Sequence, residues 1–477
     1  MAFTSPLFIA FLLLVVLATN LSRAPAWRAA VLLAANVVFI GSYVEHPVQL
    51  VPLAAFLALG WGLLEAVRRT RSSAVLAAGL VLVLATFVVL KRFSFLGDFV
   101  LPFPYLLIGL SYILFRVLHL LVDARQGELA GPVPPLQFFN YTCNFLAFTA
   151  GPIQRYPDHA AAAAQPAALD EQRVYAAFAR AIAGFVKVGV VSAVFNYLFE
   201  HLSTRLLGPA PLAWSVAVPL YVAAAVTYTV YLYANFSGYM DIVIGVGQLI
   251  GQQLPENFNR PFLARNFLEF WSRWHMTLSD WFKTYLFNPL LKALATRVTA
   301  PQAGPYLGVA AFFVTFLVMG VWHGTTAVFV VYGLLMGAGA SVNKLWQVWL
   351  TRRLGKKAYK AWCERTPVVY LSRGMTLAYF ALALTCLWVE MPQLLALLRQ
   401  LGLLGGPAAY AGLAVAAGAV FWAWDTAMAW LSPLRAGVLS ASGGVVARNL
   451  VLAVQVLLIV TVASFFHKAP EFVYRAF

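Results

Sequence analysis

Residues 73–90 read SAVLAAGLVLVLATFVVL, an apolar stretch that contains no charged side chain. A helix needs about 20 mainly apolar residues to cross the hydrocarbon core of a bilayer. Helix is also the expected conformation, because backbone polar groups in lipid must be satisfied within the segment itself. The stretch therefore predicts a transmembrane helix.

The same pattern recurs along the chain. Segments of this kind cover residues 6–20, 27–43, 51–66, 103–122, 174–199, 214–233, 306–321, 325–342, 368–388, 410–430 and 450–466. Together they predict an all-α polytopic integral membrane protein with about a dozen transmembrane helices. The short alternating strands that a transmembrane barrel would need are missing from the sequence.

Composition leads to the same fold class. Of 477 residues, 62% are hydrophobic and 10% are charged, and the mean hydropathy is +0.80. A soluble domain carries about 25% charged residues, so this chain has too little polar surface for water and we expect the lipid bilayer as its solvent. The first segment has no basic stretch before it and no A-x-A-like site after it, so we expect a retained helix rather than a signal peptide.

The net charge of +16 could indicate nucleic-acid binding, but the positions of the cations favour another explanation. Lys and Arg accumulate in the cytoplasmic loops of membrane proteins. Basic clusters lie at residues 23–28, 68–71 and 344–365, and placing them in the cytoplasm puts the N-terminus outside. Lys91 and Arg92 then fall on the outer side, against the rule. We expect a multi-pass protein of the cell inner membrane with no nucleic-acid partner.

The sequence predicts no metal site. Cys143, Cys363 and Cys386 lie far apart and lack the spacing of a metal site or a disulfide framework. Five histidines have no partner at metal-ligand spacing: His46, His119, His159, His201 and His467.

Residues 266–294 predict an amphipathic helix. Aromatic and apolar residues recur there at three- and four-residue spacing, and Glu269, Arg273 and Asp280 lie roughly opposite. Glu269 and Arg273 are four residues apart, the spacing of a helical ion pair. The pattern is more typical of an interfacial helix than of an active site. His275 lies at the border between the two faces.

Four polar residues follow the apolar run that begins at residue 214: Asn235, Ser237, Tyr239 and Asp241. They indicate either a helix break satisfied by its own side chains or a tunnel wall in contact with substrate, and structural support is the simpler explanation. Asp241 is a candidate ion-pair partner for Arg155 or Arg273.

Two small-residue patterns have simple structural explanations. The alanine run at residues 160–164 predicts a loop or a short surface helix. Gly333 and Gly337 form a small-xxx-small pair, which is typical of closely packed membrane helices.

Several motifs resemble the bacterial membrane-bound O-acyltransferase family, which includes the membrane proteins of alginate O-acetylation and teichoic-acid D-alanylation. They are LSYILFRVLHLLVDARQGEL, FTAGPIQRYPD, YANFSGYMDIVIGVGQLIG, PENFNRPF, EFWSRWHMTLSDWF, GVWHG and the tail EFVYRAF, and they run in order from about residue 100 to the end. One departure is the stretch NPLLK at residues 288–292, where alginate-type members usually carry PLGGN; it leaves the conformation of that loop open.

The resemblance implies a helical fold around a central funnel or tunnel, with re-entrant or interfacial helices. It also implies acyl transfer from a cytoplasmic thioester to an acceptor on the other side. By motif, His323 and His275 correspond to the family's histidines. We expect substrate contacts from these residues: Trp322, Asn235, Ser237, Tyr239, Asp241, Arg155 and Trp274.

The chemistry fits His323 better than His275. An imidazole with a pKa of about 6.5 can accept and return a proton near neutrality. A lone membrane histidine is more often a satisfied core residue, but the Trp322-His323-Gly324 step together with the other motifs favours catalysis. His275 either orients the acceptor or His323, or lies at the headgroup level among tryptophans; both interpretations stay open.

The resemblance thus predicts an acyltransferase with no bound cofactor. We expect one membrane domain over residues 1–477: N-terminal spans (1–100), a motif-bearing core (101–345), and a basic cytoplasmic segment with C-terminal spans (346–477). The cosubstrate is acetyl-CoA or an acyl carrier protein, and the acceptor is an extracytoplasmic glycan or a separate transferase. Acetyl is the expected group and D-alanyl the alternative. A transporter or flippase is the rival class, but it should show paired halves with matching broken helices, which this sequence lacks.

Overall fold

The computed structural model describes residues 5–97, 101, 103–166, 168–440 and 444–465. The tail motif EFVYRAF, His467 and the last residue of the predicted span 450–466 lie outside these residues. The described chain is helical and contains no strand, which confirms the predicted fold class.

Eight helices in the described residues are long and apolar enough to cross a membrane. They are Pro47–Thr70, Ser73–Lys91, Glu171–Leu206, Trp214–Leu249, Gly304–His323, Ala327–Leu354, Thr366–Leu387 and Met391–Ser432. Three shorter apolar helices are Pro6–Asn20, Pro25–Gly41 and Arg448–Ser464.

The chain divides into two compact units. In the described residues, the first unit contains the chain up to Val188 together with Phe236–Glu256. The second contains Gly189–Asn235 and the residues from Asn257 onward. The expectation of a single domain over residues 1–477 stays a prediction.

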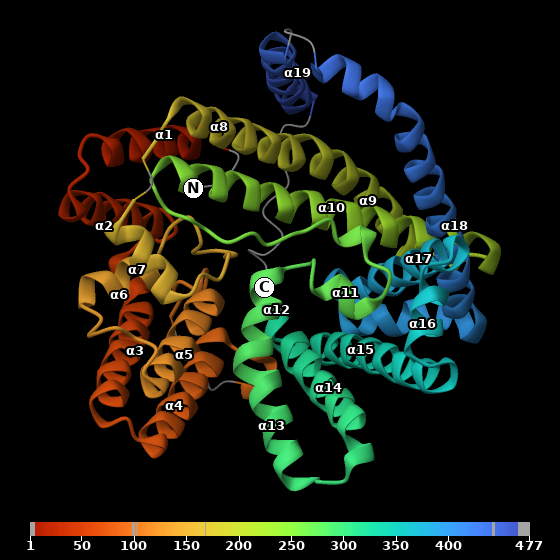
Figure 1. The fold of residues 1–477 in the computed structure, drawn as a ribbon, viewed down its shortest axis with the longest axis horizontal. Coiled ribbons are helices and arrows are strands. Elements are labelled where there is room, and N and C mark those ends of the chain that lie inside the picture. Colours follow the sequence, from red (N-terminus) through yellow and green to blue (C-terminus); the bar gives the residue numbers. More distant parts are fainter. Residues whose placement is uncertain (1–4, 98–100, 102, 167, 441–443, 466–477) are drawn as a thin grey trace. The chain divides into compact units, whose positions relative to one another are not determined.

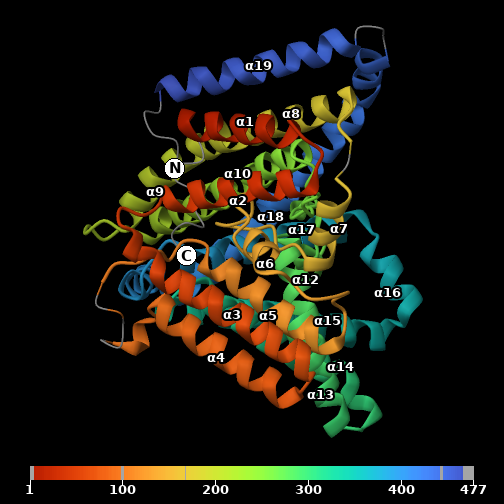
Figure 2. The ribbon, with the colours of Figure 1, turned by 90° about the vertical axis from the view of Figure 1, so that its left-hand side faces the viewer.

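The first unit is built from eight helices and the C-terminal end of a ninth. They are α1 (Pro6–Asn20), α2 (Pro25–Gly41), α3 (Val51–Thr70), α4 (Ser73–Lys91), α5 (Leu110–Gln126), α6 (Pro135–Thr142), α7 (Tyr156–Ala164), α8 (Glu171–Val186) and the end of α10 (Trp214–Leu249). Helices α3, α4 and α5 pack against one another, as the red and orange ribbons of Figures 1 and 2 show. Alanines 160–164 are the end of α7, so the short helix is the correct alternative.

Helix α5 departs from the predicted span 103–122. It begins at Leu110 and its side chains are buried over most of its length. Its polar residues hold the end of α6 and the segment after it. Arg116 donates to the carbonyl oxygens of Thr142 (2.7 Å) and Ala147 (2.5 Å), and His119 Nε2 lies 2.8 Å from the Tyr141 hydroxyl. Polar groups in this helix therefore serve packing, because buried hydrogen-bonding groups need partners.

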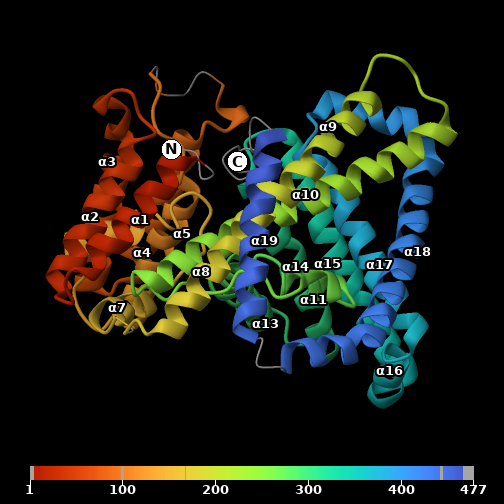
Figure 3. The same cartoon turned by 90° about the horizontal axis from the view of Figure 1, so that it is seen from above.

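The second unit contains the remaining helices. They are α9 (Ala193–Leu206), the first part of α10, α11 (Phe267–Trp271), α12 (Met276–Phe282), α13 (Asn288–Arg297), α14 (Gly304–His323), α15 (Ala327–Leu354), α16 (Lys356–Cys363), α17 (Thr366–Ala383), α18 (Met391–Ser440) and α19 (Gly444–Phe465). Figure 3 shows α14, α15 and α17 beside one another, and α17 also packs against α18. Short 3-10 or π segments join the helices at Pro47–Leu50, Ser94–Leu96, Lys187–Ser192, Pro261–Leu263, Lys283–Phe287, Pro301–Ala303 and Leu384–Leu387.

Glycines bring α14 and α15 together. A Cβ atom added at Gly320 would overlap the Cα atom of Gly333, and one added at Gly337 would lie 2.9 Å from the Phe313 carbonyl oxygen. Helix backbones can approach this closely only where the side chain is missing. The predicted packing role of Gly333 and Gly337 is confirmed.

Two helix predictions are wrong. The predicted single helix over residues 266–294 is interrupted between α11 and α12, and a π segment at Lys283–Phe287 then joins α12 to α13 without a gap. The predicted break at residues 235–241 does not occur, because α10 is continuous there. Gly238 instead lets α8 approach: a Cβ atom there would lie 2.7 Å from the Gly184 carbonyl oxygen.

Candidate active site

His275 occupies the turn between α11 and α12. Its backbone is left-handed, with φ 45° and ψ 52°, and it directly precedes the first residue of α12. A histidine in this region carries strain that the surrounding structure must offset, and such residues concentrate at functional sites. The side chain is only 1% exposed. The turn thus places an imidazole deep in the second unit.

Asn257 fixes the proton on that imidazole. Its Oδ1 atom accepts hydrogen bonds from the backbone N–H of Thr277 (3.1 Å) and from the Thr277 hydroxyl (2.9 Å). Because a backbone N–H can only donate, the Asn257 amide atom that faces it must be the oxygen. Nδ1 of His275, 3.1 Å from the same oxygen, must therefore carry the hydrogen. Neutral His275 then presents Nε2 as a lone-pair acceptor.

His323 is the last residue of α14 and is 4% exposed. The rings of Trp322 and Tyr332 lie 4.8 Å and 5.6 Å from its ring centre. The next residue, Gly324, leaves space that the Phe329 ring occupies, since a Cβ atom there would overlap that ring. The Trp-His-Gly step thus ends a helix and closes tightly around the imidazole.

The two histidines lie close enough to interact electrostatically. Burial lowers the pKa of His275 well below its usual value, and the neighbouring His323 lowers that pKa further. The helix ends act in opposite senses, because the start of α12 disfavours positive charge at His275 and the C-terminus of α14 favours it at His323. These opposite preferences suit the two histidines to different acid–base roles.

An aromatic cluster forms around Trp274, the residue before His275, in the second unit. The Trp274 ring packs against the rings of Phe258 (5.1 Å), Phe270 (5.5 Å) and Phe380 (4.9 Å) between centroids. Trp274 is 2% exposed and Trp322 is 9% exposed. Low exposure makes the surroundings apolar, which strengthens electrostatic interactions there. The substrate-binding role of both tryptophans stays a prediction.

Three of the four polar residues of α10 have separate partners. The Asn235 amide donates to the Ser192 hydroxyl at 3.2 Å in the second unit. In the first unit, the Tyr239 hydroxyl donates to the Leu146 carbonyl oxygen at 2.8 Å. Ser237 is buried, and its hydroxyl has no hydrogen-bond partner within the described residues.

Asp241 pairs with two cations in the first unit. The Arg180 guanidinium lies 3.0 Å from one carboxylate oxygen, and the Lys187 ammonium lies 2.5 Å from the other. The predicted alternatives, Arg155 and Arg273, are therefore wrong. Arg273 bonds Glu269 at 2.9 Å instead, as the i,i+4 spacing predicts.

Arg155 also has acidic partners of its own. Its guanidinium bonds Asp123 at 3.0 Å and Glu128 at 2.5 Å, and Asp123 is almost fully buried. These bonds tie the segment before α7 to the end of α5. A substrate contact by Arg155, Ser237, Tyr239, Asp241 or Asn235 stays a prediction.

Asn257 is the site residue that sequence reasoning missed. It stands in the PENFNRPF motif, one of the motifs that carry the family resemblance. Its side chain is 0% exposed, and its Nδ2 atom has no hydrogen-bond partner within the described residues. The motif holds two asparagines, and the sequence does not indicate that Asn257 is the buried one whose amide needs several partners.

Comparisons with known proteins agree with the motifs. The sequence model of the membrane-bound O-acyltransferase family matches residues 39–369. The teichoic acid D-alanyltransferase of Bacillus subtilis is 27% identical over 253 residues, 51% of this chain and 60% of that protein. The probable alginate O-acetylase of Pseudomonas fluorescens is 27% identical over 257 residues, 54% of this chain and 48% of that protein. The chain spans about half the length of the curated relatives it matches.

Proposed function

The chain belongs to the membrane-bound O-acyltransferase family, and on this premise we propose that it transfers an acyl group from a thioester to a hydroxyl, with His323 as the general base. The observation that carries the proposal is the buried His275–His323 pair, in which the two imidazoles interact and burial keeps His275 neutral. Such a pair in an apolar site suits proton transfer.

The proposed reaction has two steps. His323 removes the proton from the acceptor hydroxyl as the oxygen attacks the thioester carbonyl carbon, which gives a tetrahedral oxyanion and an imidazolium. Collapse of the oxyanion re-forms the carbonyl and breaks the carbon–sulfur bond. The leaving thiolate takes the proton back from His323. The C-terminal end of α14 stabilises the imidazolium between the two steps.

His275 has a supporting role in this scheme. Two protonated imidazoles side by side would repel each other, so a neutral His275 keeps the pair at a single positive charge. Its Nε2 lone pair can accept a hydrogen bond from the acceptor hydroxyl or from protonated His323. His275 is therefore a positioning residue whose loss should weaken turnover less than the loss of His323.

The finer assignments extend the proposal. The donor is acetyl-CoA or the thioester of an acyl carrier protein on the cytoplasmic side of the cell inner membrane, and the acceptor is an extracytoplasmic glycan or a separate transferase that serves it. Relatives named as alginate O-acetylases support acetyl transfer. Relatives named as teichoic acid D-alanyltransferases support the second candidate, carrier-dependent D-alanyl transfer.

Thiol release by the purified protein tests the function. Acetyl-CoA and an acylated carrier protein are supplied in turn, and free thiol is measured with and without an acceptor glycan. His323→Ala should lower the rate by about 10²–10⁴-fold. His201→Ala is the matched control, because His201 is exposed. Monodisperse His323→Ala protein that works at the wild-type rate would remove the assignment. Thiol release from neither thioester by the wild-type protein would remove the proposed function.

Mass spectrometry of envelope glycans separates the two acyl groups. Cells that carry the wild-type protein are compared with cells that carry His323→Ala. Acetyl esters that disappear in the variant would favour acetyl transfer, and D-alanyl esters that disappear would favour the second candidate. Unchanged esters of both kinds would contradict a glycan acceptor.

A further inference from the structure

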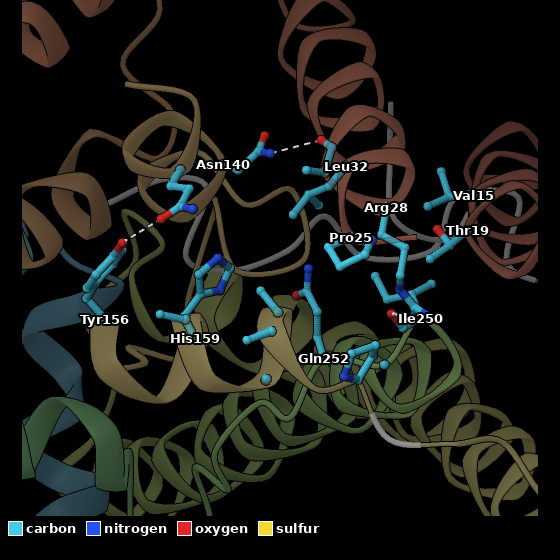
Figure 4. A pocket seen from close by; sticks show the side chains of 18 residues that line it. Val15, Thr19, Pro25, Arg28, Leu32, Asn140, Tyr156, His159, Ile250 and Gln252 are labelled. Carbon is cyan, nitrogen blue, oxygen red and sulfur yellow. Dashed lines mark hydrogen bonds between the residues drawn. The ribbon is translucent and has the colours of Figure 1, made fainter. Parts of the chain in front are cut away.

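The first unit contains a cavity of about 460 Å³, distinct from the histidine pair of the second unit. Its walls come from α1, the start of α2, α6, α7 and the residues that follow α10. Figure 4 shows the side chains around it, with Arg28 on α2 and His159 on α7. Its volume falls in the range of small-molecule sites, roughly 300–1,000 Å³.

The alanine run explains why space exists there. Ala160, Ala162, Ala163 and Ala164 of α7 line the cavity, and each contributes only a methyl group. Larger apolar side chains complete the wall: Val15, Leu32 and Ile250. The cavity is thus mainly apolar, and a ligand with a hydrocarbon part fits it.

Most polar groups in the wall are occupied by the protein itself. The Tyr156 hydroxyl donates to Gln137 Oε1 at 2.9 Å. The side-chain oxygen of Gln252 accepts from Asn144 at 2.7 Å. These groups hold the wall together and are less available to a ligand.

Arg28 and His159 keep hydrogen-bonding capacity. Arg28 Nη2 donates to the Ile250 carbonyl oxygen at 2.6 Å, which anchors the guanidinium at the wall. Within the described residues it has no carboxylate partner, and it is the one charged side chain of the lining. His159 is 8% exposed, and its ring lies tilted against the Tyr141 ring with 5.2 Å between the centroids. Its side chain makes no hydrogen bond within the same residues.

We propose that this cavity binds one anionic phospholipid, whose phosphate pairs with Arg28 and whose acyl chain lies along the apolar wall. A guanidinium makes charge-assisted, often bidentate bonds to phosphate oxygens. His159 is neutral, since burial lowers its pKa to about 4. It therefore offers one donor and one acceptor to the uncharged part of the headgroup.

The surroundings favour a lipid over a soluble anion. Helix α1 next to the cavity exposes large apolar side chains, Leu14 at 65% and Leu17 at 67%. Arg23 and Arg28 form a basic cluster that the positive-inside rule places on the cytoplasmic side. Anionic lipids are concentrated in that leaflet and attract such clusters.

Native mass spectrometry of the purified full-length protein tests the site. The protein is titrated with phosphatidylglycerol or phosphatidylcholine. Arg28→Gln should weaken phosphatidylglycerol binding about tenfold or more, and phosphatidylcholine binding by less, because the choline cation already offsets the charge of that lipid's phosphate. Ala163→Phe, which fills the cavity, should weaken both lipids. Arg23→Gln is the matched control, because Arg23 is exposed and does not line the cavity. Arg28→Lys, which keeps the charge, should retain most of the binding and serves if Arg28→Gln fails to fold.

Three outcomes would overturn the proposal. Equal losses in Arg23→Gln and Arg28→Gln would assign the lipid to general surface charge. Displacement of phosphatidylglycerol by equimolar inorganic phosphate would assign the cavity to a soluble anion. Displacement by acetyl-CoA would assign it to a thioester donor. None of these readouts depends on turnover, so the lipid site can fail while the acyl-transfer proposal stands.

Discussion

The Oδ1 atom of Asn257 accepts a hydrogen bond from Nδ1 of His275 at 3.1 Å, and this contact determines which imidazole nitrogen carries the proton. The same oxygen also accepts from the backbone N–H of Thr277, the second residue of α12. One buried amide therefore controls both the tautomer of His275 and the start of the helix behind it.

Replacing Asn257 should change the pH dependence of the reaction. Asn257→Asp keeps the acceptor oxygen but adds a negative charge beside His275, which stabilises the imidazolium. We expect the acid limb of the kcat/KM profile to move to higher pH. Asn257→Ala removes the acceptor and should lower kcat/KM by roughly tenfold or more, about 1.4 kcal/mol of transition-state stabilisation.

Asn259 supplies the control for this pair of variants. It stands two residues away in the same motif, and its side chain is exposed. Asn259→Asp adds the same charge away from the imidazole. An equal shift of the acid limb in both Asp variants would contradict a positioning role for Asn257.

Two substitutions can separate the effect of the left-handed backbone at His275 from the effect of its imidazole. Glycine adopts φ 45° without steric cost, whereas alanine in this region loses about 1–2 kcal/mol. His275→Gly and His275→Ala should therefore lose turnover to the same degree, with measurable residual activity, while His275→Gly unfolds at the higher temperature. Turnover in either variant as low as in His323→Ala would promote His275 to an equal catalytic role.

The close contact between α14 and α15 should be sensitive to a single methyl group. Gly320→Ala places a Cβ atom where the Cα atom of Gly333 lies, so the helices must separate one turn before His323. We expect a loss of roughly 1–3 kcal/mol in unfolding free energy and a lower kcat. Thermal unfolding and thiol release measure the two effects.

Gly308 is the control within the same helix. A Cβ atom at this position has no neighbour within 4 Å. Gly308→Ala should therefore raise stability by roughly 0.5–1 kcal/mol, because alanine favours the helix. Similar losses from Gly308→Ala and Gly320→Ala would mean that helix separation is not the cause.

The sequence predicts the helices better than it predicts their junctions. Apolar length indicates α4 and α14 directly, because a span needs little besides hydrophobic residues. The break at His275 was not predictable from periodicity, since the aromatic spacing continues through residues 266–294 and the interruption depends on Asn257, 18 residues earlier. Long-range hydrogen bonds of this kind leave no local pattern.

Polar residues within an apolar stretch led to the opposite error, a predicted helix break that does not occur. Asn235, Ser237, Tyr239 and Asp241 suggested a break, yet α10 is continuous. The partners of Asn235, Tyr239 and Asp241 lie elsewhere in the chain, as Arg180 and Lys187 do for Asp241. The histidine motifs nonetheless led to His275 and His323, which the structure brings together. Local motifs thus predicted the pair, and tertiary contacts supplied its tautomer and its strain.

Acidification should destabilise the protein through His159. In the folded state burial lowers the pKa of His159 to about 4, whereas in the unfolded chain it lies near the ordinary value of about 6.5. Between these two values the unfolded state binds more protons, so the unfolding free energy must fall as the pH drops. The stabilisation that neutral His159 contributes is complete above about pH 6.5, and each unit of pKa difference corresponds to about 1.4 kcal/mol of unfolding free energy.

Thermal unfolding in detergent between pH 7.5 and pH 4.5 measures this slope, which His159→Gln should flatten because glutamine does not titrate. His201→Gln, a change at an exposed histidine, should leave the wild-type slope in place. Identical slopes for His159→Gln and the wild-type protein would mean that His159 is not held neutral by the fold.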